Sequence, residues 1–98
     1  MRIQSEKIDV LYELESSVFE CLLIAVNEAM RNGFNIAGCN VSIFQKEYLN
    51  THKKELMIHF FPVKITPENA SEYELVQDDF CVYIDVFTKK VIRSCSSI

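Results

Sequence analysis

The C-terminal third of this chain constrains its fold most strongly, because two apolar runs there are separated by a short polar joint. The residues read Val82-Tyr83-Ile84-Asp85-Val86-Phe87-Thr88-Lys89-Lys90-Val91-Ile92. Runs rich in β-branched and aromatic residues on both sides of polar residues are typical of a tight antiparallel hairpin. Asp85 and Thr88 carry side chains that hydrogen-bond turn backbone. The pattern predicts strands over residues 80–87 and 90–95.

Earlier in the chain, apolar residues recur at helical spacing. Ser17 followed by Glu20 fits a capping box, and Gly33 stands where helices commonly end. These signals predict a helix over residues 16–32. The residues that carry the apolar spacing are Val18, Leu22, Ala25, Val26, Ala29 and Met30.

The residues before this helix fit two structures. Alternation of apolar residues over 8–14 is typical of a strand, whereas a stripe through Ile8, Leu11 and Leu14 continues the helix. Asp9 would cap the longer helix. We favour one helix, straight or kinked, over residues 9–32.

In the middle of the chain, apolar residues recur at every second position. Alternation predicts strands over residues 38–48 and 55–61, separated by a polar turn at 50–53. Pro62 has no backbone N–H, so the second strand ends there or lies at an edge. Residues 66–68 fit the start of a short helix that ends between 73 and 76, or an ordinary loop.

These elements predict an α+β fold in a single domain, residues 1–98, with an N-terminal helix packed on a four-stranded antiparallel sheet. The alternative is a ferredoxin-like βαββαβ arrangement, in which residues 8–14 form a strand and residues 66–76 a helix. A hydrophobic fraction of 49% indicates a folded chain and excludes general disorder.

The net charge of −4 argues against a nucleic-acid-binding protein, which needs a clustered basic face. Residues 65–79 contain five acids and neither Lys nor Arg, which indicates either a solvated segment or a docking surface for a basic partner. The first residues lack the features of a signal peptide, and the longest apolar run, 21–26, is too short to cross a bilayer. We therefore expect a cytoplasmic protein without membrane contact.

The cysteines occur without the C-x-x-C spacing of metal or redox motifs. In a reducing compartment they are expected to be reduced, small and buried. A disulfide or a zinc site is the alternative. The four are Cys21, Cys39, Cys81 and Cys95.

His59 is the best single candidate for chemistry. It shares strand parity with Met57 and Phe61, so it could pair across the sheet with Asp85 or a cysteine. The alternative is an ordinary strand histidine. One functional hypothesis is therefore a small-molecule binder or minor enzyme that uses His59 and Asp85 in a pocket between helix and sheet, without a metal or cofactor.

The last strands should place side chains of two kinds on opposite faces. Tyr83, Asp85 and Phe87 share one parity, opposite to Val82, Ile84 and Val86. We expect the aliphatic side chains to pack against the helix, leaving rings and carboxylates outward. Such a face is typical of protein–protein recognition, where aromatic residues anchor and charges select. A ligand cavity under the sheet, or a homodimer through the aromatic face, are alternatives.

The segment Ile84-Asp85-x-x-Thr88-x-Lys90-Val91-Ile92 resembles the terminal hairpin of small bacterial immunity proteins of the cystatin-like, or nuclear transport factor two-like, fold, and of PepSY domains. That hairpin usually reads Ile-Asp-x-x-Thr-Gly-x-Val. The strand ending Ile58-His59-Phe60-Phe61-Pro62 looks like the aromatic strand before it. Lys89 replaces the glycine, which implies strain or a different turn.

The resemblance implies a protein that binds and occludes a toxin or effector enzyme, with no catalytic residues of its own. The leading hypothesis is thus a non-catalytic protein-binding module whose partner has a basic surface. The predicted contact residues are acids and aromatic residues of the second half of the chain: Glu72, Glu74, Asp78, Asp79, Tyr83, Asp85 and Phe87.

Overall fold

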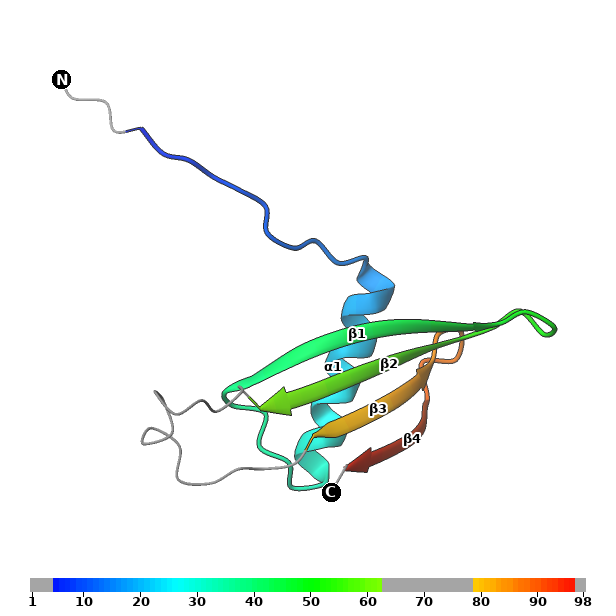
Figure 1. Cartoon of the computed structure of the whole chain (residues 1–98). Helices are drawn as coiled ribbons and strands as arrows, with labels where there is room; N and C mark the ends of the chain where they lie inside the picture. Colours follow the sequence, from blue (N-terminus) through cyan, green and yellow to red (C-terminus); the bar gives the residue numbers. More distant parts are fainter. Residues whose placement is uncertain (1–4, 63–78, 97–98) are drawn as a thin grey trace.

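A computed structural model describes residues 5–62 and 79–96. Helix α1 (Ser16–Arg31) is followed by strands β1 (Cys39–Tyr48), β2 (Lys53–Pro62), β3 (Phe80–Asp85) and β4 (Val91–Ser96). The strands pair antiparallel in the order β1-β2-β3-β4, and α1 lies across one face of this sheet (Figure 1). The α+β class and the antiparallel sheet are confirmed.

The segment before α1 differs from both predictions. Residues 5–15 form neither helix nor strand, so the favoured helix over 9–32 is wrong, as is the strand that the ferredoxin-like alternative needs at 8–14. The apolar side chains of Ile8 and Tyr12 remain exposed. Short helices depend on packing of an apolar face, and this segment has no packing partner within the described chain. The predicted helix or loop at 66–76 lies outside the described residues.

The ends of α1 are formed in different ways. The residue before the helix, Glu15, makes no side-chain cap, and the predicted capping box is absent because Ser17 lies inside the first turn. At the other end Gly33 has φ +78°, and its N–H donates to the Met30 carbonyl at 3.0 Å. The next N–H, of Phe34, donates to the Ala29 carbonyl at 2.9 Å. This pair of bonds is a Schellman motif, which confirms the predicted glycine stop.

The core forms where a stripe of small residues on α1 meets the central strands. Cys21, Ala25 and Ala29 are fully buried, as are the aliphatic side chains opposite them, Ile58 on β2 and Ile84 on β3. Small residues let the helix approach the sheet closely. The prediction that alternate aliphatic residues of the last strands lie beneath the helix is confirmed for β3. The remaining buried core residues are Leu56, Phe60, Phe80 and Val82.

The β3–β4 turn is held by the side chain of Asp85. Its Oδ1 accepts hydrogen bonds from the backbone N–H groups of Phe87 at 2.8 Å and Thr88 at 2.9 Å. Lys89 adopts φ +59°, the conformation that a glycine takes without strain. Of the two alternatives for Lys89, the strained one is therefore observed. Strand β3 ends at Asp85, so the predicted strand over 80–87 is too long and Phe87 belongs to the turn.

Lys89 also links the turn to the helix. Its Nζ donates to Ser17 Oγ at 2.6 Å and to the Val86 carbonyl oxygen at 2.7 Å. The Ser17 hydroxyl that sequence pattern assigned to a cap is thus used as an acceptor for a residue 72 positions away. This contact fixes the N-terminal end of α1 beside the β3–β4 turn.

Truncation of the core tests this packing. Replacing Ile58 by Ala should lower the free energy of unfolding by about 2–5 kcal/mol, because it removes a fully buried side chain and leaves a cavity. Leu49→Ala, at a mostly exposed position in the β1–β2 turn, should change it by less than about 0.5 kcal/mol. Urea unfolding measures both. Equal, small effects would contradict the assigned core.

The Asp85 turn predicts a specific acid response. The backbone N–H groups of Thr88 and Phe87 hold the pKa of the Asp85 carboxyl below its ordinary value. A carboxyl whose pKa is lowered in the folded state stabilises the fold fully at pH values above its unfolded-state pKa, which is about 3.9. This stabilisation is lost as the pH falls through the folded-state pKa. Asp85→Asn, which keeps an acceptor without titrating, should therefore flatten the loss of stability between about pH 5 and pH 2.

The measurement is the urea midpoint at pH 7 and at pH 3 for wild type, Asp85→Asn and Asp85→Ala. The wild-type protein should lose more stability than either variant over this interval. Asp85→Ala should also be less stable than Asp85→Asn at pH 7, because it leaves the two turn N–H groups without their acceptor. A pH response identical in all three proteins would refute the role of this carboxylate.

Candidate functional site

The sheet face opposite α1 carries a row of large side chains across all four strands. Cross-strand register places Phe44 of β1 beside Met57 of β2, Met57 beside Tyr83 of β3, and Tyr83 beside Arg93 of β4. Their parity is opposite to that of the buried aliphatic residues. Within the described residues, α1 is the only helix and it lies on the other face (Figure 1). We call this surface the open face.

A depression of about 280 Å³ lies on the open face. Ligand pockets for small molecules are typically larger, roughly 300–1,000 Å³. The volume therefore suits one inserted side chain better than a whole substrate. The depression is lined by Phe44, Lys46, Glu55, Met57, Tyr83 and Arg93.

Glu55 is the unusual member of this set. It is only 8% exposed, and its Oε2 is buried without a hydrogen-bond partner among the described residues. Its two cross-strand neighbours are occupied elsewhere: the Lys46 ammonium lies 4.9 Å from the centre of the Tyr48 ring, and Asp85 holds the β3–β4 turn. A buried polar atom without a partner costs free energy, typically about 1–3 kcal/mol. Glu55 thus presents an unused acceptor at the depression.

Arg93 lies on the other side of the same depression. Its guanidinium carbon is 3.9 Å from the centre of the Tyr83 ring, a cation–π arrangement that orients both side chains. Among the described residues, no carboxylate forms an ion pair with this guanidinium. Among the described residues, the site therefore contains a carboxylate oxygen without a hydrogen-bond donor, a guanidinium without a carboxylate partner, and the Tyr83 ring stacked against that guanidinium.

His59 lies on the open face but outside the depression. Its Nε2 is 2.8 Å from Asp79 Oδ2, and its ring stands 5.2 Å from that of Phe61. The predicted partner Asp85 lies opposite Glu55 instead, while Cys81 is the residue opposite His59. The predicted His59–Asp85 pair is therefore wrong. His59 also faces away from the helix, so it does not line a pocket between helix and sheet.

The cysteines have different environments. No disulfide joins them within the described residues, and Cys21 is buried as expected, Cys39 and Cys81 are half-buried, and Cys95 is exposed against expectation. Burial raises the pKa of the Cys81 thiol, which disfavours the nucleophilic thiolate beside His59. Residues 5–62 and 79–96 contain no group of three or more side chains placed to hold a metal ion.

The predicted contact residues fall into three groups. Tyr83 lies at the centre of the open face. Asp79 is bonded to His59, which lies on the same face. Asp85 and Phe87 instead belong to the β3–β4 turn, where Phe87 is 70% exposed and Asp85 is engaged with backbone. The other three, Glu72, Glu74 and Asp78, lie outside the described residues.

Sequence reasoning missed Glu55, Arg93, Phe44 and Lys46. Alternation along β2 places Glu55 on the same face as Met57 and His59, so the sequence predicts the face on which Glu55 lies. The sequence does not predict that Glu55 is buried, because its burial depends on which residues of β1 and β3 lie beside it.

Comparisons with models of known families, with curated proteins and with solved structures found no match to this chain. No helix in the described ranges has the length and apolar character needed to cross a bilayer.

Glu55 provides a direct test of that geometry. Glu55→Leu should raise the free energy of unfolding by about 1 kcal/mol, because it removes a buried acceptor without a partner and adds apolar contact with Met57 and Tyr83. Glu47→Leu, at an exposed acid of β1, is the matched control and should have an effect below about 0.5 kcal/mol. Chemical denaturation measures both. A strong loss of stability in Glu55→Leu would show that this carboxylate is satisfied and structural.

Proposed function

We propose that this protein is a non-catalytic binding module that receives a protein partner on its open face. The observation that carries the proposal is the buried Glu55 oxygen, which no described residue partners, at a depression beside the stacked Tyr83 and Arg93. An unsatisfied group kept at a stability cost is typical of a surface that is completed by a partner.

The chemistry of the depression favours a basic side chain from the partner. The Glu55 carboxylate would accept from an ammonium or guanidinium, while Met57 and Tyr83 cover the aliphatic stem. Arg93 and Lys46 at the sides would pair with acids next to that basic residue. Tyrosine and arginine at the centre of a contact surface are also the residue types that most often dominate binding energy.

A more specific form of the proposal is an immunity-type inhibitor that binds and occludes a toxin or effector enzyme in the cytoplasm. It is supported by the resemblance of the β3–β4 hairpin to that of cystatin-like immunity proteins, and by the helix on an antiparallel meander that such a fold requires. Asp79 and the exposed Phe87 would extend the contact beyond the depression. An occluding protein needs complementarity to the enzyme's active-site cleft and no catalytic group.

The test compares immobilised wild-type protein with variants of the open face. We expect Glu55→Gln and Tyr83→Ala each to raise the Kd of the captured partner at least tenfold, which is about 1.4 kcal/mol. Leu49→Ala, an exposed apolar residue outside the face, should leave the Kd unchanged. The partner is captured from the producing organism, identified, purified and measured by calorimetry.

Two results would contradict the proposal. One is a partner whose affinity is the same for wild type, Glu55→Gln and Tyr83→Ala. The other is equal loss in the Leu49→Ala control, which would indicate non-specific apolar capture. For the immunity-type form, addition of the protein should abolish the enzymatic activity of the partner, and Glu55→Gln should restore it.

A further inference from the structure

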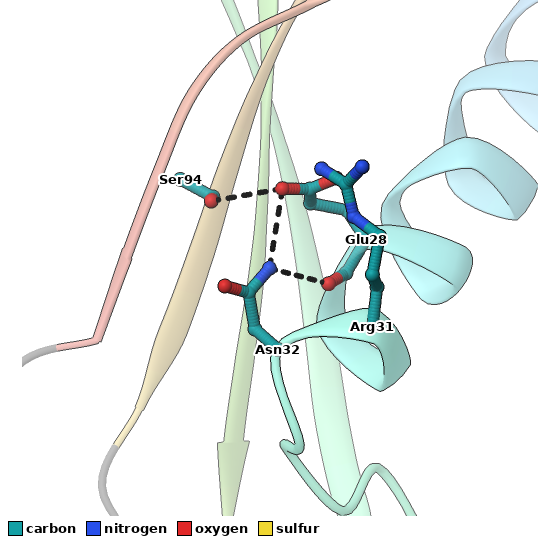
Figure 2. Close-up of polar contacts among 4 residues, drawn as sticks. All are labelled: Glu28, Arg31, Asn32 and Ser94. Atoms are coloured by element: carbon teal, nitrogen blue, oxygen red, sulfur yellow. Dashed lines mark hydrogen bonds and ion pairs between the residues drawn. The ribbon is translucent and has the colours of Figure 1, made fainter.

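Cys81 and Cys95 lie directly opposite one another on the two strands of the β3–β4 hairpin. Val82, which follows Cys81, is fully buried in the core on the helix side, so Cys81 points to the open face. Ser94, which precedes Cys95, points to the helix, where its Oγ donates to Glu28 Oε1 at 3.2 Å (Figure 2). Cys95 therefore points to the same face as Cys81.

This pair meets the geometric requirements of a disulfide. Residues directly opposite in an antiparallel sheet have Cα atoms about 4.5 or 5.5 Å apart, and a disulfide spans Cα separations of about 4.4–6.8 Å. The Cys81 and Cys95 side chains are already hydrogen-bonded to each other. Strand β4 lies at an edge of the sheet and Cys95 is its next-to-last residue, so a small approach of the two Cβ atoms disturbs no other described strand.

The other two cysteines do not compete for this pairing. Cys21 is fully buried beneath α1, on the opposite face of the sheet from Cys81 and Cys95. Cys39 begins β1, and β2 separates it from β3, which places it about 9–10 Å from that strand. No residue of α1 approaches β1 within 8 Å between Cα atoms, so Cys21 and Cys39 are also too far apart for a disulfide.

We propose that Cys81 and Cys95 form a thiol–disulfide modification site whose oxidant is a small-molecule disulfide. First, the Cys95 thiolate attacks one sulfur of that disulfide, so a mixed disulfide forms on Cys95 and one small thiolate leaves. Then the Cys81 thiolate attacks the Cys95 sulfur, so the intrachain disulfide forms and the second small thiolate leaves. Two electrons pass from the cysteine sulfurs to the small disulfide, and the two thiol protons end on the two small thiols released.

Exposure determines which thiol reacts first. Cys95 is exposed, so an oxidant reaches its Sγ without movement of the sheet. Cys81 is half-buried, and burial raises the pKa of its thiol, while Cys95 and Asp79 beside it raise this pKa further. Cys81 is therefore the weaker first nucleophile, but it lies next to the mixed disulfide once Cys95 carries it.

The dithiol stands apart from the proposed partner site. Neither cysteine lines the depression that contains Glu55. A failure of partner binding would leave disulfide formation unchanged, and absence of the disulfide would leave the partner site unaffected.

Peptide mapping after thiol exchange tests the pairing. Each cysteine lies in a different tryptic peptide, and these peptides are 8–31, 32–46, 65–89 and 94–98. The reduced full chain is incubated with excess glutathione disulfide, and the remaining thiols are alkylated. We expect peptides 65–89 and 94–98 to be joined and the chain to be lighter by two hydrogen atoms. Excess reduced glutathione should reverse the change.

Serine variants test the order of the two steps. Cys81→Ser should keep one glutathione on Cys95, because the second thiol is missing. Cys95→Ser should take up glutathione at Cys81 at least about tenfold more slowly than Cys81→Ser takes it up at Cys95. Cys39→Ser, at another half-buried cysteine, is the matched control and should form the same joined peptides as wild type. Circular dichroism verifies that each variant is folded.

Two results would overturn the proposed site. One is a wild-type protein that keeps reduced thiols or single glutathione adducts without the link between 65–89 and 94–98. The other is a link through Cys21 or Cys39, or between chains, in place of this one. Equal rates of glutathione uptake in Cys81→Ser and Cys95→Ser would contradict the assignment of Cys95 as the first nucleophile.

Discussion

The close packing of three small residues of α1 against the aliphatic centre of the sheet determines most of this structure. Cys21, Ala25 and Ala29 have short side chains, so the helix backbone approaches Ile58 and Ile84 until no solvent remains between them. Close packing of this kind contributes much of the stability of a small domain. One helix covers only one face, and strand alternation then assigns every other side chain to the uncovered face.

That assignment explains the composition of the open face. Tyr83 and Met57 are there because their strand neighbours are needed in the core, and register brings Arg93 and Glu55 beside them. The Lys89 contact with Ser17 holds the helix end to the β3–β4 turn, so the layers keep their relative position. The composition of the open face is thus a consequence of core packing together with a small number of cross-strand pairs.

The sequence predicted the parts of the fold that depend on local chemistry. The glycine stop of α1, the meander, the Asp85 turn and the separation of Ile84 from Tyr83 all follow from residue type and period. It did not predict the segment before α1, because the apolar residues at 8–14 fit both the favoured helix and a strand, and the described part of the domain supplies no contact that stabilises either. The capping box failed because the Ser17 hydroxyl is used by a distant residue.

The candidate site was predictable only in part, for the same reason. Tyr83 could be placed by parity alone, whereas Asp85 was assigned to a partner although its carboxylate is engaged by turn backbone. Glu55 and Arg93 gain their importance from neighbours on other strands. Those neighbours are fixed by register, which a single sequence without aligned relatives does not specify.

The packed core and the open face require that the two faces of the sheet differ in solvent exposure, and solvent paramagnetic relaxation measures this difference most directly. With a soluble paramagnetic agent added to the protein alone, the ε-methyl group of Met57 should relax strongly, while the δ-methyl groups of Ile58 and Ile84 should be protected. Equal protection of Met57 and Ile58 would show that the open face is covered in the isolated protein. Strong relaxation of Ile58 or Ile84 would show that the helix does not pack where the structure places it.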